Sequence, residues 1–192
     1  MPPPPNGRNR GQKGGVTDID RKDAKKKVAI SKVEQKTAHA ALMKKIEARR
    51  KALDTADAAL AKAEKTLGGL HKEAKTLEAR ETKILAIVKR DAPDAVLVYE
   101  RGDIREVERL VENERLFEEM KKAHETRVRI ARQIETVAEQ IRDWTETGKP
   151  PPPTASISLL LTFLALILRA ALLQRKRIAT ERKQLDKEAK GG

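Results

Sequence analysis

The chain has 192 residues, of which 37% are charged and only 2% are aromatic, and its net charge is +13. Long helices and coiled coils have this composition, whereas a globular core normally relies on aromatic side chains for much of its buried area. There is no cysteine, so disulfides and thiolate metal sites are excluded. The positive charge favours an anionic partner, such as a membrane surface or a nucleic acid.

The first elements in the chain are an arm and a long helix. Residues 1–19 are rich in proline, glycine and basic side chains and lack the apolar core of a secretory signal, which predicts a disordered basic arm. The first long helix is predicted over 20–90. Pro93 disfavours helical backbone at the residue before it, so a connecting loop is expected over 91–102. The stretch 95–103, most of which lies in that loop, is compatible with either a short helix or an extended segment.

Apolar residues of the first helix recur in alternating steps of four and three. This period of 3.5 residues predicts a coiled-coil seam, interrupted by the polar residues Arg49 and Glu81. Its main apolar members are Leu42, Ile46, Leu53, Leu60, Leu67, Leu70, Leu77 and Ile84.

A second coiled-coil helix is predicted over 103–148. Asp103 and Glu106 have the spacing of a capping box, and the heptad frame shifts near 111–116, which indicates a stutter. Its seam, in which Arg127 is polar, includes Ile130, Ile134, Val137 and Ile141.

Charge and length favour pairing of these two helices as an antiparallel hairpin. Residues 28–90 carry 15 Lys and Arg against 8 Asp and Glu, whereas residues 91–148 carry 10 against 15, and opposite charges favour the mixed pair. Folded back from the break, the second helix would extend about 66 Å and reach residue 47. This register places Glu81 near 112–116 and Arg49 near 144–148. The alternative is a parallel homodimer through the first helix alone.

After a proline-rich spacer over 149–154, residues 155–173 are predicted to form a transmembrane helix. This segment is apolar around its whole circumference and would extend about 28 Å, close to the ~30 Å hydrocarbon core of a bilayer. Its one charge lies near its end, where an arginine stem can reach the headgroups. The predicted anchor residues are Ile157, Leu160, Phe163, Leu164, Ile167, Leu168 and Arg169. The alternative is a helix buried in a larger assembly.

The basic tail over 174–192 gives the chain the layout of a single-pass, tail-anchored protein. The positive-inside rule would keep this tail cytosolic, but the large N-terminal part has no signal for translocation. We therefore expect a cytosol-facing N-terminal domain, at the mitochondrial outer membrane, the peroxisome or the endoplasmic reticulum. In a bacterium, the inner membrane is the equivalent expectation.

Two basic clusters are predicted to contact an anionic surface. They consist of Arg21, Lys22, Lys25, Lys26, Lys27, Arg175, Lys176 and Arg177. A solvated basic tail is the alternative for the first cluster. Nucleic acid is disfavoured as a partner, because few aromatic side chains are present for base stacking.

The sequence offers no catalytic or metal site. His39, His71 and His124 are isolated, and phosphate-loop, nucleophile-elbow and zinc motifs are absent. We therefore expect no enzyme activity and no cofactor.

The predicted fold is all-α, with a long antiparallel coiled-coil hairpin followed by one C-terminal transmembrane helix. The expected function is a membrane-anchored tether, adaptor or scaffold that contacts the bilayer and binds proteins through its coiled coil, homo-oligomers included. The alternatives are a SNARE-like fusion protein, with Arg127 as a polar layer, or a basic coiled-coil protein bound to nucleic acid or ribosomes.

Overall fold

The computed structural model describes residues 18–141 and 151–191 of the chain. In these two ranges the protein consists of helices and short connections, without a strand. The predicted all-α class is therefore confirmed for the described residues. Residues 1–17, 142–150 and 192 lie outside the described ranges. They include most of the predicted arm, the end of the predicted second helix and the start of the predicted spacer.

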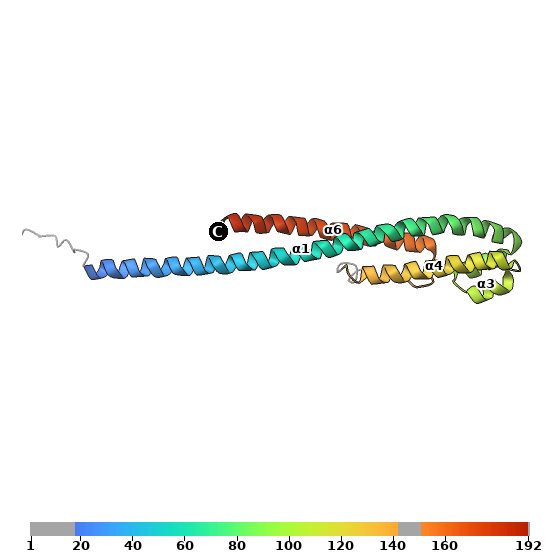
Figure 1. Cartoon of the computed structure of the whole chain (residues 1–192), viewed down its shortest axis with the longest axis horizontal. Helices are drawn as coiled ribbons and strands as arrows, with labels where there is room; N and C mark the ends of the chain where they lie inside the picture. The colour runs from blue at the N-terminus through green and yellow to red at the C-terminus, as the bar shows by residue number, and fades with distance from the viewer. Residues whose placement is uncertain (1–17, 142–150, 192) are drawn as a thin grey trace, which may run out of the picture. The chain divides into compact units, whose positions relative to one another are not determined.

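The first helix, α1, extends without a break from Asp18 to Asp91 (Figure 1). Its residues belong to two compact units, one ending at Ala48 and the other comprising Arg49–Gly191. All the helices that follow α1 lie in the second unit.

Two short helices occupy and extend beyond the segment predicted as a connecting loop. α1 ends where Ala92 leaves helical geometry, and Pro93 then opens α2 (Pro93–Glu100), because proline suits the first turn of a helix. Gly102 turns the chain with a φ of +82°, a conformation that glycine adopts without steric cost. α3 (Ile104–Leu110) follows.

The caps of α3 and α4 show why the predicted second helix is not continuous. The Asp103 carboxylate accepts a hydrogen bond from the Glu106 N–H at 3.2 Å, which is half of the predicted capping box. At Val111 the backbone is extended, and Asn113 caps a new helix by accepting from the Leu116 N–H at 3.1 Å. In its described part, up to residue 141, the predicted helix over 103–148 therefore forms two helices, α3 and α4 (Glu114–Ala138). The break falls where the heptad frame shifts.

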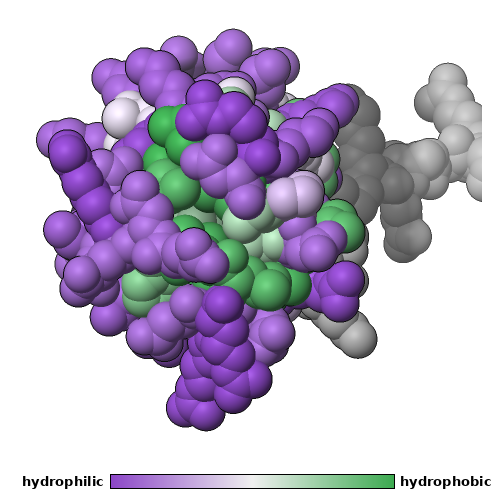
Figure 2. Space-filling model, turned by 90° about the vertical axis from the view of Figure 1, so that its right-hand side faces the viewer, coloured by the Kyte–Doolittle hydropathy of each residue, from purple (hydrophilic) through white to green (hydrophobic). Residues whose placement is uncertain are grey.

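Two buried apolar clusters hold the second unit together. The first joins residues 60–77 of α1 with residues 123–141 and with the start of the last helix, α6 (Ile157–Gly191). The second joins the end of α1 with α2, α3 and the start of α4. Figure 2 faces the end of the unit where α1 gives way to α2, and shows hydrophobic residues framed by hydrophilic ones.

The predicted apolar seam residues are buried, with the exception of Leu42, which is 42% exposed. The register between α1 and α4, however, differs from the prediction: Glu81 lies beside Arg127 rather than residues 112–116. The physical reason is that residues 92–111 pack as two short helices instead of forming a tight turn, which moves α4 along α1. Arg49 pairs with Glu181 of α6. The predicted proximity of Arg49 to residues 144–148 lies outside the described residues.

α6 is a single helix of 35 residues that combines the predicted anchor with the predicted basic tail. The helix therefore continues without a break past residue 174, where the predicted tail begins. The backbone stays helical because residues 174–190 contain no proline or glycine and are rich in helix formers.

Candidate functional site

The candidate functional site is the apolar half of α6. Ser156 starts this helix as its N-cap, with its Oγ accepting a hydrogen bond from the Leu159 N–H at 3.3 Å. Two residues earlier, Thr154 lies against the turn between α2 and α3: a Cβ added to Gly102 would come within 3.0 Å of Thr154 Cγ2. The start of α6 is therefore held beside the end of the unit that α2 and α3 form.

One stripe of the apolar half of α6 is covered by protein. Within the most apolar 18-residue window of α6, only 28% of the residues are buried. The buried residues pack into the cluster shared with α1 and α4, and they are Ile157, Leu160, Leu161, Leu164, Ile167 and Ala171.

Another stripe of α6 carries large apolar side chains that remain substantially exposed. These residues are between 41% and 48% exposed, and they are Leu159, Leu166, Leu172 and Leu173. Three of them recur at intervals of seven residues and so share one face. The helix thus has one face that packs against its own chain and one that is open.

The structure divides the predicted anchor residues between these environments. Ile157, Leu160, Leu164 and Ile167 are buried against the protein, Phe163 and Leu168 are half-buried, and Arg169 is exposed. The first four therefore contact protein in this structure, where the sequence predicted contact with lipid.

The buried stripe has a sequence signal that the prediction missed. Counting from Ile157, positions 160, 164, 167, 171, 174 and 178 follow alternating steps of three and four, which is a heptad seam. The signal was hidden because most of the neighbouring residues up to Leu173 are also apolar, so the seam does not stand out from them.

The basic residues predicted to contact an anionic surface have different surroundings. Arg21, Lys22, Lys25, Lys26 and Lys27 are exposed on α1, in the first unit. In the second unit, Lys176 is exposed. Arg175, by contrast, donates to two carboxylates of α1, at 3.0 Å to Asp57 and 2.7 Å to Glu64.

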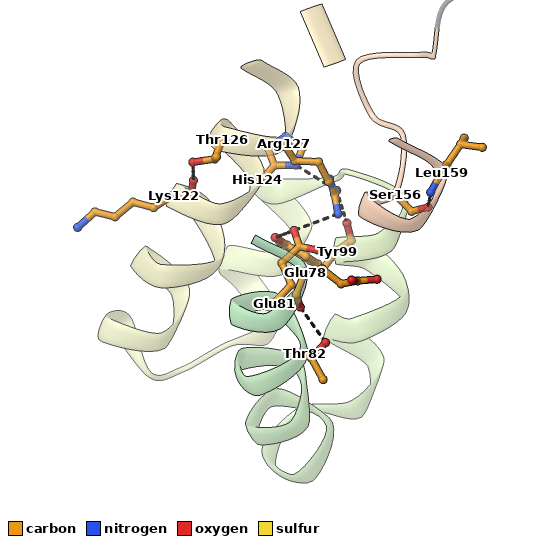
Figure 3. Close-up of polar contacts among 10 residues, drawn as sticks. All are labelled: Glu78, Glu81, Thr82, Tyr99, Lys122, His124, Thr126, Arg127, Ser156 and Leu159. Atoms are coloured by element: carbon orange, nitrogen blue, oxygen red, sulfur yellow. Dashed lines mark hydrogen bonds and ion pairs between the residues drawn. The ribbon is translucent and has the colours of Figure 1, made fainter. Parts of the chain in front are cut away.

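A buried polar group joins α1, α2 and α4 (Figure 3). Tyr99 donates its phenolic hydrogen to Glu81 Oε1 at 2.7 Å, and Arg127 Nη1 lies 3.5 Å from the same oxygen. Arg127 Nη2 also donates to the Tyr99 carbonyl at 3.2 Å, and its guanidinium lies 4.9 Å from the centre of the tyrosine ring. The sequence identified Glu81 and Arg127 as polar seam positions but did not predict that they pair.

Burial governs the ionisation of this group. Desolvation raises the pKa of Glu81, against the opposing effects of the Tyr99 hydrogen bond and the Arg127 charge. Burial and the neighbouring carboxylate likewise raise the pKa of Tyr99. His124 Nδ1 lies 3.3 Å from Arg127 Nη2, and burial together with this positive charge lowers the pKa of His124. The carboxylate of Glu81, the phenol of Tyr99 and the guanidinium of Arg127 are buried together, and their contacts join three helices.

In residues 18–141 and 151–191, no group of three His, Asp or Glu side chains is placed to hold a metal ion. Comparison of the chain with protein-family models, with curated proteins and with solved structures finds no match.

Proposed function

We propose that the protein is a membrane-anchored tether or adaptor without catalytic activity. In this proposal α6 is the anchor, and α1 and α4 form an antiparallel coiled-coil arm that binds protein partners. The lipid bilayer is the partner of α6. The basic residues at the start of α1 and beyond the apolar half of α6 contact its anionic headgroups.

The observation that supports an anchor is the amount of leucine surface that the chain leaves open. The core helix of a water-soluble protein with the same hydropathy would be mostly covered, whereas 28% of this window is buried. Covering one leucine side chain contributes about 1.5–3 kcal/mol, and four leucines of α6 are more than 40% exposed. A hydrocarbon phase covers all of them without requiring a partner of matching shape.

Hydrogen bonding within α6 also suits a bilayer. The Thr162 hydroxyl donates to the Ser158 carbonyl at 3.1 Å, so it carries its own acceptor into an environment without water. Arg169 stands four residues before the end of the predicted span, where its side chain can reach the headgroup layer.

The contacts between α1 and α4 support the antiparallel arm. Glu73 of α1 pairs with Arg129 and Glu81 with Arg127, so higher numbers on one helix accompany lower numbers on the other. Arg127 is paired within its own chain, which favours an arm over a SNARE-like assembly that would need this side chain in an intermolecular layer.

Alkaline carbonate extraction of cell membranes tests the anchor. We expect the full chain to stay in the membrane pellet. Leu166→Arg should move it to the soluble fraction, since arginine at the centre of a span costs about 2.5–3.5 kcal/mol. Leu166 is exposed, so the folded unit tolerates the substitution. Leu97→Arg, at an exposed leucine of α2, is the matched control and should behave like the wild type. Release of the wild-type chain would overturn the proposal.

A water-soluble scaffold is the second candidate, and the heptad seam of α6 is the observation that favours it. In that case the open leucines of α6 would pack against another protein. Carbonate would then release the wild type and both variants alike, which separates the two candidates.

A further inference from the structure

The residues that would face lipid in a spanning α6 are in part the residues that pack against α1 and α4. Leu160 and Ile167 are fully buried in this packing, and Leu164 is 1% exposed. One side chain cannot contact the hydrocarbon core and the protein core at the same time. The docked arrangement of α6 is therefore incompatible with a spanning one.

A set of ion pairs extends the docking beyond the apolar half of α6. Asp57 is at its centre: its Oδ1 accepts from Arg175 Nε at 3.0 Å, and its Oδ2 lies 3.7 Å from Arg182 Nη1. Arg175 also donates to Glu64, and Arg182 donates to Asp54, both at 2.7 Å. The Asp57 side chain is the least exposed carboxylate of the set, at 25%.

The signs of these pairs specify how α6 docks. Where α1 contributes carboxylates, α6 contributes Arg175 and Arg182, whereas at Arg49 and Arg50 of α1 the partners on α6 are acidic, Glu181 and Asp186. Residue numbers fall along α6 as they rise along α1, so the helices run in opposite directions. A slide of one heptad that moves Arg175 and Arg182 from Asp57 to Arg50 would bring like charges together, which opposes that register.

We infer that α1 and α4 form a docking site for the chain's own membrane anchor, and that anionic lipid competes with Asp57 and Glu64 for Arg175. In the docked state, α1 and α4 cover one face of α6, and Asp57 and Glu64 neutralise the charge of Arg175. At a membrane, headgroup phosphates replace the two carboxylates and hydrocarbon replaces the seam. This inference rests on the proposed membrane role of α6.

An intramolecular cross-link measures docking directly. The chain has no cysteine, so Ala56→Cys and Ile178→Cys introduce the only thiols. Both positions line one groove between α1 and α6. In vesicle-free buffer, a short bismaleimide should join them within single chains. Cross-linking before addition of phosphatidylcholine–phosphatidylserine vesicles should prevent carbonate-resistant binding, whereas cross-linking after addition should give a lower yield.

The Asp57→Asn/Glu64→Gln variant tests the competition. Removal of both partners of Arg175 should lower the cross-link yield in buffer and raise the vesicle-bound fraction about two- to tenfold, the range expected from one or two partly exposed ion pairs. Glu73→Gln is the matched control, because Glu73 pairs with Arg129 of α4 and not with α6. Vesicles of phosphatidylcholine alone should undock α6 in a smaller fraction of the chains than vesicles that also contain phosphatidylserine.

Each outcome bears on a different claim. Absence of an intramolecular product in buffer overturns the docked state. If the chain binds vesicles stably and the cross-link yield after vesicle addition equals the yield in buffer, the competition is overturned. The proposed anchor is then unaffected. A wild-type chain that fails to bind vesicles, and is also released from cell membranes by carbonate, overturns the proposed function and with it this inference.

Discussion

Arg127 of α4 and Glu81 of α1 form an ion pair in the protein interior, with 1% and 4% of each residue exposed. The pair sets the register between the two helices, because a shift of either one would leave a buried charge without its partner. The guanidinium is not fully satisfied: Arg127 Nε is buried without a hydrogen-bond partner. The pair therefore specifies an arrangement at some expense in stability.

Removing one member of this pair should destabilise the second unit more than removing both. Glu81→Leu or Arg127→Met alone leaves a buried uncompensated charge, with an expected loss of about 3–5 kcal/mol. The double variant should recover most of that loss. Chemical denaturation of the four proteins gives the coupling energy, and additive single effects would contradict the role of the pair.

Acidification should weaken the second unit through His124. Its pKa is lowered from 6.5 by burial and by Arg127, so the folded state binds fewer protons than the unfolded state below that pH. The free energy of unfolding should therefore be highest above pH 6.5 and fall as pH drops through 6.5. The groups facing the ring are Arg127 and Glu125 of α4 and Tyr99 of α2.

The difference between His124→Gln and the wild type isolates this contribution, because Glu81 and all other acids titrate in both proteins. Unfolding measured at pH 7.5 and 5.5 should show a smaller loss of stability for the variant. Equal losses would mean that His124 does not contribute to the pH dependence.

Gly102→Ala and Gly68→Ala should change stability in opposite directions. Gly102 has a φ of +82° and lies against Thr154, so alanine there should cost about 1–2 kcal/mol from backbone strain alone. Gly68 lies inside α1 with no atom within 4 Å of an added Cβ, so alanine should stabilise by about 0.5–1 kcal/mol. Thermal unfolding followed by circular dichroism compares the two, and equal shifts would contradict the turn geometry.

Substitutions of two leucines of α6 test whether this helix packs against α1 and α4 in solution. Leu164 is 1% exposed and Leu166 is 48% exposed. If α6 is docked, Leu164→Ala should cost about 2–5 kcal/mol and Leu166→Ala much less. Denaturation in the absence of lipid distinguishes them, and equal costs would indicate that the two faces of α6 are equivalent in water.

Repeating patterns in the sequence determined the helical class, the seam positions of α1 and α4, and the apolar character of α6. These features depend on residue spacing, which a helix converts directly into a face. Near residue 111 the sequence shows a shift of the heptad frame, which predicts a stutter within one helix. The structure instead has a break there, where α3 ends at Leu110 and Asn113 caps the start of α4.

The tertiary structure alone decided the register and the placement of α6. A heptad seam is nearly periodic, so it allows several alignments of two helices, and the choice between them depends on Glu81 meeting Arg127 and on the space that α2 and α3 occupy. In α6 the heptad seam is present in the sequence, but it does not stand out from its apolar neighbours, so hydropathy alone did not show which stripe packs on protein. The carboxylates that pair with Arg175, Asp57 and Glu64, lie more than 100 residues away in the chain, so no local pattern predicts them.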